Sequence, residues 1–470
     1  MKVLREFHIT NLLELKLEKG HWDEEGDEDP YVKENIRVQI YINGNPFRTC
    51  KFLLIVNPHL EKKFETINSI DEVKEILNKD LEYKITPAVL NISPEEEFWA
   101  HCSNLQAWVE NDYDTHLLDS KLSFPLLKEL KRLGDSKAKQ VYNEEVMERY
   151  AKGSCDVKDL LISKKYFENI PFEQQVSIIK DPKEYEVILT LKKVMGDEFK
   201  LGKFFIDDGK ITKLRLQENP NVHALPSEIG DLSNLRWLDI SLPNLSSLPS
   251  TIGNLRSLET LKITDSNLTE LPESIGNLNK LDLISISNCK KFESLPDSFG
   301  KISSLKDLRI IDSNLTMLPE SFGNLSLLEK VEIENGLLEF LPSGITNITN
   351  LLFLLLSKNK LSNLPEDIEN LINLKSLHLG NNKLEELPLS IGNLPRLESL
   401  KLYGNNLRSL PDTMKNLVNL KSLDIRLNKF NHFPEVILKL TSLKYLAIAG
   451  NRITHLPEKI KNLFLGVKAR

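Results

Sequence analysis

A 23-residue unit recurs through the second half of the chain and constrains its fold more than any other feature. Three consecutive copies read LKSLHLGNNKLEELPLSIGNLPR, LESLKLYGNNLRSLPDTMKNLVN and LKSLDIRLNKFNHFPEVILKLTS, and they share the template LxxLxLxxNxLxxLPxxIxxLxx. A fixed period of this length predicts a solenoid in which each coil stacks on the next. Eleven copies, numbered here as coils 1–11, run from about residue 211 to residue 465 and start at Ile211, Leu235, Leu258, Leu281, Leu305, Leu328, Leu351, Leu374, Leu397, Leu420 and Leu443.

Each repeat predicts one short strand followed by a return segment. In the LxL core the leucines point inward and the residues between them point outward, because side chains alternate along a strand. Stacked copies then form a parallel sheet, and the proline of the LP pair sets the turn of the return path. About seven apolar positions per coil, each contributing roughly 1.5–3 kcal/mol when buried, hold neighbouring coils together. No single coil could bury that face alone.

The ninth residue of the repeat is expected to satisfy the backbone where the chain leaves the strand, since an Asn amide both donates and accepts hydrogen bonds. Six coils have the asparagine: Asn219, Asn359, Asn382, Asn405, Asn428 and Asn451. Coils 2–6 have other residues, which replace part of that bonding or none of it: Pro243, Ser266, Cys289, Ser313 and Gly336. We therefore predict that coils 2–6 are the softer part of the solenoid.

The repeats resemble the leucine-rich repeat family, in particular its intracellular 23-residue LPxxIgnL class. Ras-binding leucine-rich scaffold proteins of eukaryotes and intracellular repeat proteins of plants belong to that class. The resemblance covers roughly residues 211–465, which is over half of the chain. It implies a right-handed α/β horseshoe solenoid, with the parallel sheet on its concave face, that binds proteins and has no catalysis of its own. It also implies a small GTPase or another signalling protein as the class of partner.

The outward strand positions of the coils form the predicted binding surface. Exposed aromatic residues and arginine dominate interface energetics, and an apolar cluster on an open sheet face commonly marks a binding patch. An earlier group consists of Trp237, Asp239 and Leu242. Drift within the repeats, or a self-associating edge, is the alternative explanation of the apolar residues. The later group centres on coil 7, which offers Phe353 and Leu355 with Leu352 beside them. Flanking coils add Ile311, His378, Lys401, Tyr403, Arg426, Leu427 and Tyr445.

Residues 1–203 lack the period and predict a smaller α+β domain that caps the solenoid, ahead of a repeat domain over residues 204–470. Strands are expected within about residues 1–60, two of them around an Asn-Gly turn, and helices within about residues 68–195. The segments YINGNPFRTCKFLL, EEFWAHCSNLQAWVENDYDTHLL and FPLLKELKRLGDSKAKQVYNEEV resemble a module that precedes leucine-rich repeats in predicted archaeal proteins. That resemblance implies no activity.

The stretch EEFWAHCSNLQAWVENDYDTH sets a histidine beside a cysteine and so raises the question of catalysis. Ser93 and Glu96 form a capping-box pattern that starts a helix over about residues 94–111. On that helix Cys102 lies in the apolar stripe, whereas His101 lies about 100° away around the axis. A thiol in such a stripe is a small buried hydrophobe with a raised pKa. We expect a structural helix, and neither a catalytic pair nor a metal site.

Composition narrows the classes of function. A formal charge of −7 gives no support for nucleic-acid binding. The four cysteines are far apart, and every apolar run is shorter than the roughly 20 residues of a membrane helix. We therefore expect a cytoplasmic, non-catalytic scaffold for an unidentified protein, with no cofactor, metal or membrane partner. Two alternatives stay open: an enzymatic N-terminal domain that uses the repeats to read its substrate, and a structural homo-oligomer formed through the C-terminal coil near Phe464 and Leu465.

Overall fold

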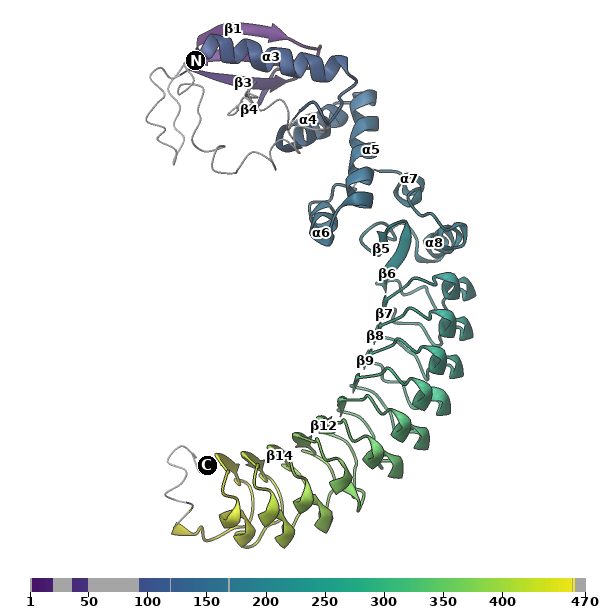
Figure 1. Ribbon diagram of the computed structural model, residues 1–470, viewed down its shortest axis with the longest axis vertical. Coiled ribbons are helices and arrows are strands. Elements are labelled where there is room, and N and C mark those ends of the chain that lie inside the picture. Colours follow the sequence, from purple (N-terminus) through teal and green to yellow (C-terminus); the bar gives the residue numbers. More distant parts are fainter. Residues whose placement is uncertain are drawn as a thin grey trace, which may run out of the picture. The chain divides into compact units, whose positions relative to one another are not determined.

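The computed structural model describes residues 2–19, 36–49, 93–118, 120–167, 170–458 and 460 (Figure 1). The chain divides into two compact units, Met1–Ile170 and Pro171–Arg470, which are described separately below. The start of the helical region expected from about residue 68, and the C-terminal residues Phe464 and Leu465, lie outside the described residues. Within the described ranges, no helix combines the length and the apolar character needed to span a bilayer.

The first unit opens with a four-stranded antiparallel sheet in the order β1-β2-β3-β4. Its expected Asn-Gly turn joins β3 to β4, with positive φ at Asn43 (48°) and Gly44 (75°), as a tight hairpin turn requires. Alternate residues of β2 and β3 are buried, and Leu15 pairs with the buried Ile40. The strands are β1 Lys2–His8, β2 Leu13–Lys19, β3 Ile36–Ile42 and β4 Asn45–Thr49.

The helices of this unit begin with the one that raised the question of catalysis. The capping box is present, because Ser93 N donates to Glu96 Oε2 (2.8 Å) and Glu96 N donates to Ser93 Oγ (3.3 Å). Cys102 is 2% exposed, and burial raises the pKa of its thiol to about 12. The predicted capped helix and the burial of its thiol are confirmed. The helices are α3 Pro94–Glu110, α4 Ser120–Arg132, α5 Ser136–Lys152 and α6 Cys155–Ser163.

The second unit is the solenoid, with one strand per repeat as predicted. The strands form a single sheet in sequence order, parallel throughout except that β5 is antiparallel to β6. In Figure 1 the strands follow the inner curve of this unit. They are β5 Phe204–Asp207, β6 Lys210–Gln217, β7 Trp237–Ser241, β8 Thr260–Thr264, β9 Leu283–Ser287, β10 Asp307–Ile311, β11 Lys330–Glu334, β12 Phe353–Leu355, β13 Ser376–His378, β14 Ser399–Lys401, β15 Ser422–Asp424 and β16 Tyr445–Ala447.

The return segments carry short 3₁₀ helices along the outer curve (Figure 1). Most of them start directly after the proline of the LP pair, whose fixed φ suits that corner. The leucines of the repeat are buried between strand and helix, so the predicted α/β solenoid is confirmed. The 3₁₀ helices are η2 Ser227–Asp231, η3 Ser250–Asn254, η4 Glu273–Asn277, η5 Asp297–Lys301, η6 Glu320–Asn324, η7 Ser343–Asn347, η8 Ile368–Asn370, η9 Leu389–Asn393, η10 Asp412–Asn416 and η11 Glu435–Lys439.

The N-terminal end of the solenoid is covered by helices α7 (Phe172–Val176) and α8 (Pro182–Met195), which belong to the second unit. Glu184 of α8 is fully buried and accepts hydrogen bonds from Ile211 N (2.6 Å) and Asn234 Nδ2 (2.8 Å). These bonds tie the cap to coil 1. The compact unit that holds the repeats therefore starts at Pro171, ahead of the expected boundary at residue 203, and α8 packs with the repeats.

Candidate protein-binding surface

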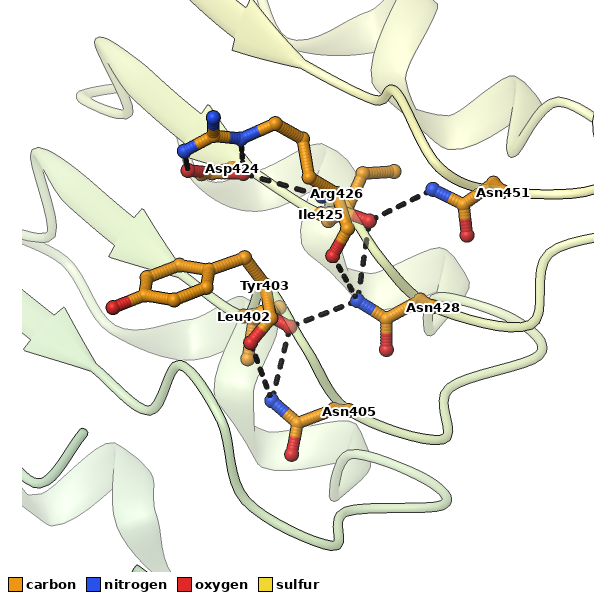
Figure 2. A network of polar contacts seen from close by, with 8 residues as sticks. All are labelled: Leu402, Tyr403, Asn405, Asp424, Ile425, Arg426, Asn428 and Asn451. Atoms are coloured by element: carbon orange, nitrogen blue, oxygen red, sulfur yellow. Dashed lines mark hydrogen bonds and ion pairs between the residues drawn. The ribbon is translucent and has the colours of Figure 1, made fainter. Parts of the chain in front are cut away.

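A row of asparagines fixes the backbone of the later coils from behind the sheet face (Figure 2). Asn405 Nδ2 donates to Leu379 O of the preceding coil and to Leu402 O of its own coil, both at 2.9 Å. Its Oδ1 accepts from Leu384 N at 3.0 Å. Each side chain therefore satisfies backbone groups of two coils and sets the spacing between their strands. The same pattern recurs at Asn359, Asn382, Asn428 and Asn451.

The earlier coils are held differently. Asn219 Nδ2 donates to Met195 O (3.0 Å) at the end of α8, so this asparagine ties coil 1 to the cap and does not join the row. In coils 3 and 4, Ser266 Oγ lies 3.2 Å from Cys289 Sγ. In coil 5, Ser313 Oγ is buried without a hydrogen-bond partner among the described residues. Coils 2–6 thus supply no such amide themselves, although Asn359 of coil 7 bonds Ile333 O and Leu338 N of coil 6.

We define the C-terminal surface as the outward residues of coils 7–11 named above. Phe353 (38% exposed) and Tyr445 (51% exposed) stand at its two ends. The strand register places Ser376, Ser399 and Ser422 in a row between them. Because neighbouring strands lie about 4.8 Å apart, the two aromatic residues are about 19 Å from each other. Small side chains therefore separate two exposed aromatic anchors.

The middle of the C-terminal surface is held in place by contacts between neighbouring coils (Figure 2). Arg426 forms an ion pair with Asp424 (Nη2 to Oδ2, 2.6 Å), and its guanidinium lies 5.9 Å from the ring centroid of Tyr403. A Cβ atom at Gly380 would lie 2.3 Å from Tyr403 Cε1, so the ring lies directly over this glycine. An aromatic side chain held in this way loses little entropy when a ligand binds.

The remaining predicted residues give this surface its polarity. Burial lowers the pKa of His378 to about 4, with a further contribution from the charge of Lys401, so the imidazole is neutral at pH 7. Its Nε2 lies 3.4 Å from Ser399 Oγ. Lys401 makes no ion pair within the described part of the chain. Leu355 is half-buried, and Leu427 is 61% exposed with a positive φ of 55°.

Trp237 does not join the C-terminal surface, because β8, β9, β10 and β11 lie between β7 and β12 in the sheet. Leu242, expected beside it on the surface, is fully buried, which corrects the prediction. The residue before a proline is driven to extended backbone, and Leu242 precedes Pro243. In other coils the same position has positive φ, as at Asp265 (49°) and Asn288 (54°). The repeat template alone does not reveal this exception.

The sequence reasoning also missed the charged side chains around Trp237. Arg215 and Lys262 lie over the two neighbouring strands, with charge-to-centroid distances of 4.9 and 5.7 Å from the Trp237 ring. Lys213 lies 5.6 Å from the ring centroid of Phe205. These residues occupy outward positions of β5, β6 and β8. Ranking outward positions by charge as well as by apolar character would have found them.

One group in the first unit has the residue types of a metal site. The carboxylates of Glu6 and Glu14 and the ring of His8 bring ligand atoms within 4.8 Å of one another. Lys16 Nζ lies 3.1 Å from Glu6 Oε1 and 3.3 Å from Glu14 Oε1. The ammonium group of Lys16 therefore already balances the charge of these carboxylates. We interpret the four side chains as an ion-pair network on the sheet.

Three family models match the repeat half of the chain. The model described as a leucine-rich repeat region matches residues 213–317, and two further leucine-rich repeat models match residues 395–453 and 373–394. The comparison with curated proteins found no significant match.

Three solved structures that are similar to this chain come from different kinds of leucine-rich repeat protein. The leucine-rich repeat protein LIC12759 of Leptospira interrogans is 30% identical over 54% of this chain and 76% of its own, with a TM-score of 0.37. The leucine-rich repeat domain of the type III effector XCV3220 (XopL) is 24% identical over 65% and 95%, with a TM-score of 0.42. The ectodomain of the Arabidopsis thaliana receptor kinase GASSHO1/SCHENGEN3, solved with CASPARIAN STRIP INTEGRITY FACTOR 2, is 27% identical over 53% of this chain and 31% of its own, with a TM-score of 0.45.

The matched residues coincide with the stacked coils, and a leucine core, an LP corner and one strand recur there with the same period. On this sequence and fold together, the second unit is a leucine-rich repeat solenoid.

Proposed function

We propose that the protein is a non-catalytic scaffold that binds a partner protein on the concave face of coils 7–11. Leucine-rich repeat domains are generally modules for protein–protein interaction. The observation that carries the choice of surface is the pair of exposed aromatic residues, Phe353 and Tyr445, at the ends of the serine row. Aromatic side chains on a solvent-facing sheet are typical anchors of protein interfaces.

The structure of the C-terminal surface supports a role in recognition more than one in catalysis. Tyr403 and Arg426 are fixed by Gly380 and Asp424, so the surface is formed before a partner arrives. The asparagine row behind it keeps the five strands at a constant spacing. A rigid, aromatic and weakly charged surface suits a folded or extended protein segment.

By resemblance to Ras-binding scaffold proteins, we propose a small GTPase or another signalling protein as the partner, and the cytoplasm as the location. Both proposals come from the repeat class and from the cysteine usage in the sequence. The proposed partner class and location are independent of the proposed surface, because a partner of another class could also bind to Phe353 and Tyr445.

The surface can be tested with a double variant, Phe353→Asp with Tyr445→Asp. Each change places a charge where an apolar ring would be buried on binding, so we expect capture of specific partners from a cytosolic extract to fall by roughly 30-fold or more. Leu389→Asp is the matched control, since Leu389 is 67% exposed but lies on η9 along the outer curve. Partners that the double variant still retains as well as the control does would place the binding site elsewhere.

A further inference from the structure

Coils 1–3 carry a second, chemically different group of side chains on the same sheet. We call Phe205, Lys213, Arg215, Trp237 and Lys262 the basic–aromatic cluster. The strand register pairs Phe205 with Lys213 and Lys213 with Trp237. Arg215 lies 4.9 Å from the Trp237 ring centroid and 5.7 Å from that of Phe205, and Lys262 lies 5.7 Å from Trp237. The indole is therefore held between two cations that come from the strands on either side of it.

The cations of this cluster differ from those of β10 and β11 in having no carboxylate partner among the described residues. Lys213, Arg215 and Lys262 make no ion pair with the described residues of the chain. On β10 and β11, by contrast, Arg309 pairs with Asp307 (2.6 Å) and Lys330 with Glu332 (2.7 Å). The same face thus holds paired cations in coils 5 and 6 and unpaired cations in coils 1–3.

One carboxylate, Asp239, lies between Arg215 and Lys262 in the register. It is half-buried, and Gln217 Nε2 donates to its Oδ2 at 3.3 Å. Burial raises the pKa of this carboxyl group, against the opposing charges of Arg215 and Lys262. Three cations stand against this single acid, so the cluster keeps a net positive charge.

The aromatic rings give the cations a defined geometry. A cation over an aromatic face is attracted by the electron-rich ring, which limits the motion of a long side chain. A guanidinium held on an indole still offers its N–H fork to a carboxylate. Arg215 is thereby pre-organised for an anion that approaches along the sheet, and Trp237 offers its half-exposed edge for apolar contact.

We propose that the basic–aromatic cluster binds an extended acidic segment of a partner protein. One carboxylate of the segment pairs with Arg215, a second pairs with Lys262, and an apolar side chain between them packs on Trp237. The two cation-bearing strands are two strand spacings apart, or about 10 Å, so two separate carboxylates of one segment can each meet a cation. Asp239, between the cations, also disfavours a dianion and tolerates the neutral middle of such a segment. The proposal does not depend on the C-terminal surface.

The experiment uses the full chain and a fluorescein-labelled probe peptide, GEAFAEG, in which both acids and the phenylalanine share one face of an extended strand. Binding is followed by fluorescence polarisation at low salt, since screening weakens exposed charge pairs. We expect the unaltered chain to bind GEAFAEG and to bind the uncharged analogue GQAFAQG at least tenfold more weakly. Arg215→Gln with Lys262→Gln should lower the affinity for GEAFAEG by at least tenfold.

The matched control is Arg309→Gln with Lys330→Gln, which removes the same charges from the same sheet face where they are already paired. This control should change the affinity for GEAFAEG less than twofold. The double variant Phe353→Asp, Tyr445→Asp should also change that affinity less than twofold. Circular dichroism checks that every variant is folded. Equal losses in the two glutamine variants, absence of binding, or displacement of the peptide by inorganic phosphate at equal concentration would each overturn the proposal.

Discussion

At the scale of single residues, the ninth position of the repeat decides how firmly neighbouring coils are joined. Asn405 connects three backbone groups of two coils while being buried itself. A buried backbone group left without a partner costs about 1–3 kcal/mol, so one side chain can matter more here than a leucine on the surface.

We predict that Asn405→Ala destabilises the solenoid by about 1–3 kcal/mol, because Leu384 N loses its partner. The carbonyls of Leu379 and Leu402 keep the bonds that they accept from Asn382 and Asn428. Urea unfolding followed by circular dichroism measures the loss. Asn406→Ala is the control, since Asn406 is the next residue and is partly exposed, and it should change stability by less than about 0.5 kcal/mol. Equal effects of the two variants would contradict the structural role assigned to Asn405.

At the scale of elements, strand length alone would make coils 2–6 the firmer part of the solenoid, against the prediction that they are softer. Strands β7–β11 have five residues each, whereas β12–β16 have three. The backbone bonds nevertheless continue past the shorter strands, as in Leu379 N to Lys401 O (2.7 Å) and Asn381 N to Tyr403 O (2.6 Å). The difference that remains is the buried amide, which only the later coils have.

Backbone amides of coils 2–6 should therefore exchange with deuterium faster than those of coils 7–10. Local opening needs less free energy where fewer bonds join neighbouring coils. Hydrogen exchange read by mass spectrometry on peptides from equivalent positions of each coil gives the comparison. Coil 11 is left out, since terminal coils fray in any array. A uniform exchange profile across coils 2–10 would refute the idea.

At the scale of the whole molecule, the position of the cap decides which fragment can fold. Each coil has an apolar face that only a neighbour or a cap can bury. Helix α8 supplies that cover through Glu184, and the compact unit begins at Pro171.

We predict that a fragment starting at Pro171 folds with a melting temperature within a few degrees of the repeat transition in the full chain. A fragment starting at residue 204 loses the cap and the buried bonds of Glu184, so it should melt at a clearly lower temperature or aggregate. Differential scanning calorimetry of the two fragments tests the boundary. Identical melting temperatures would mean that residues 171–203 contribute nothing to the solenoid.

Much of this fold was predictable because the same pattern of leucines, asparagine and proline recurs in eleven copies, with substitutions at some positions. The period, the LxL strands and the Asn-Gly hairpin all follow from local rules, and the structure confirms them. The cap boundary did not follow, since the contact of Glu184 with Ile211 joins distant residues that no periodic pattern marks. Leu242 was misplaced because a single proline overrides the template at that coil. The charges around Trp237 were overlooked because aromatic character was weighed above charge.

The sheet runs in sequence order, so coils 4–6 alone set how far the basic–aromatic cluster lies from the C-terminal surface. Gain or loss of one complete 23-residue copy there would leave both groups of side chains intact and shift their separation along the sheet by about 4.8 Å. The number of copies thus sets, in whole steps of one strand spacing, the length of a ligand that can reach both groups of side chains on the inner face.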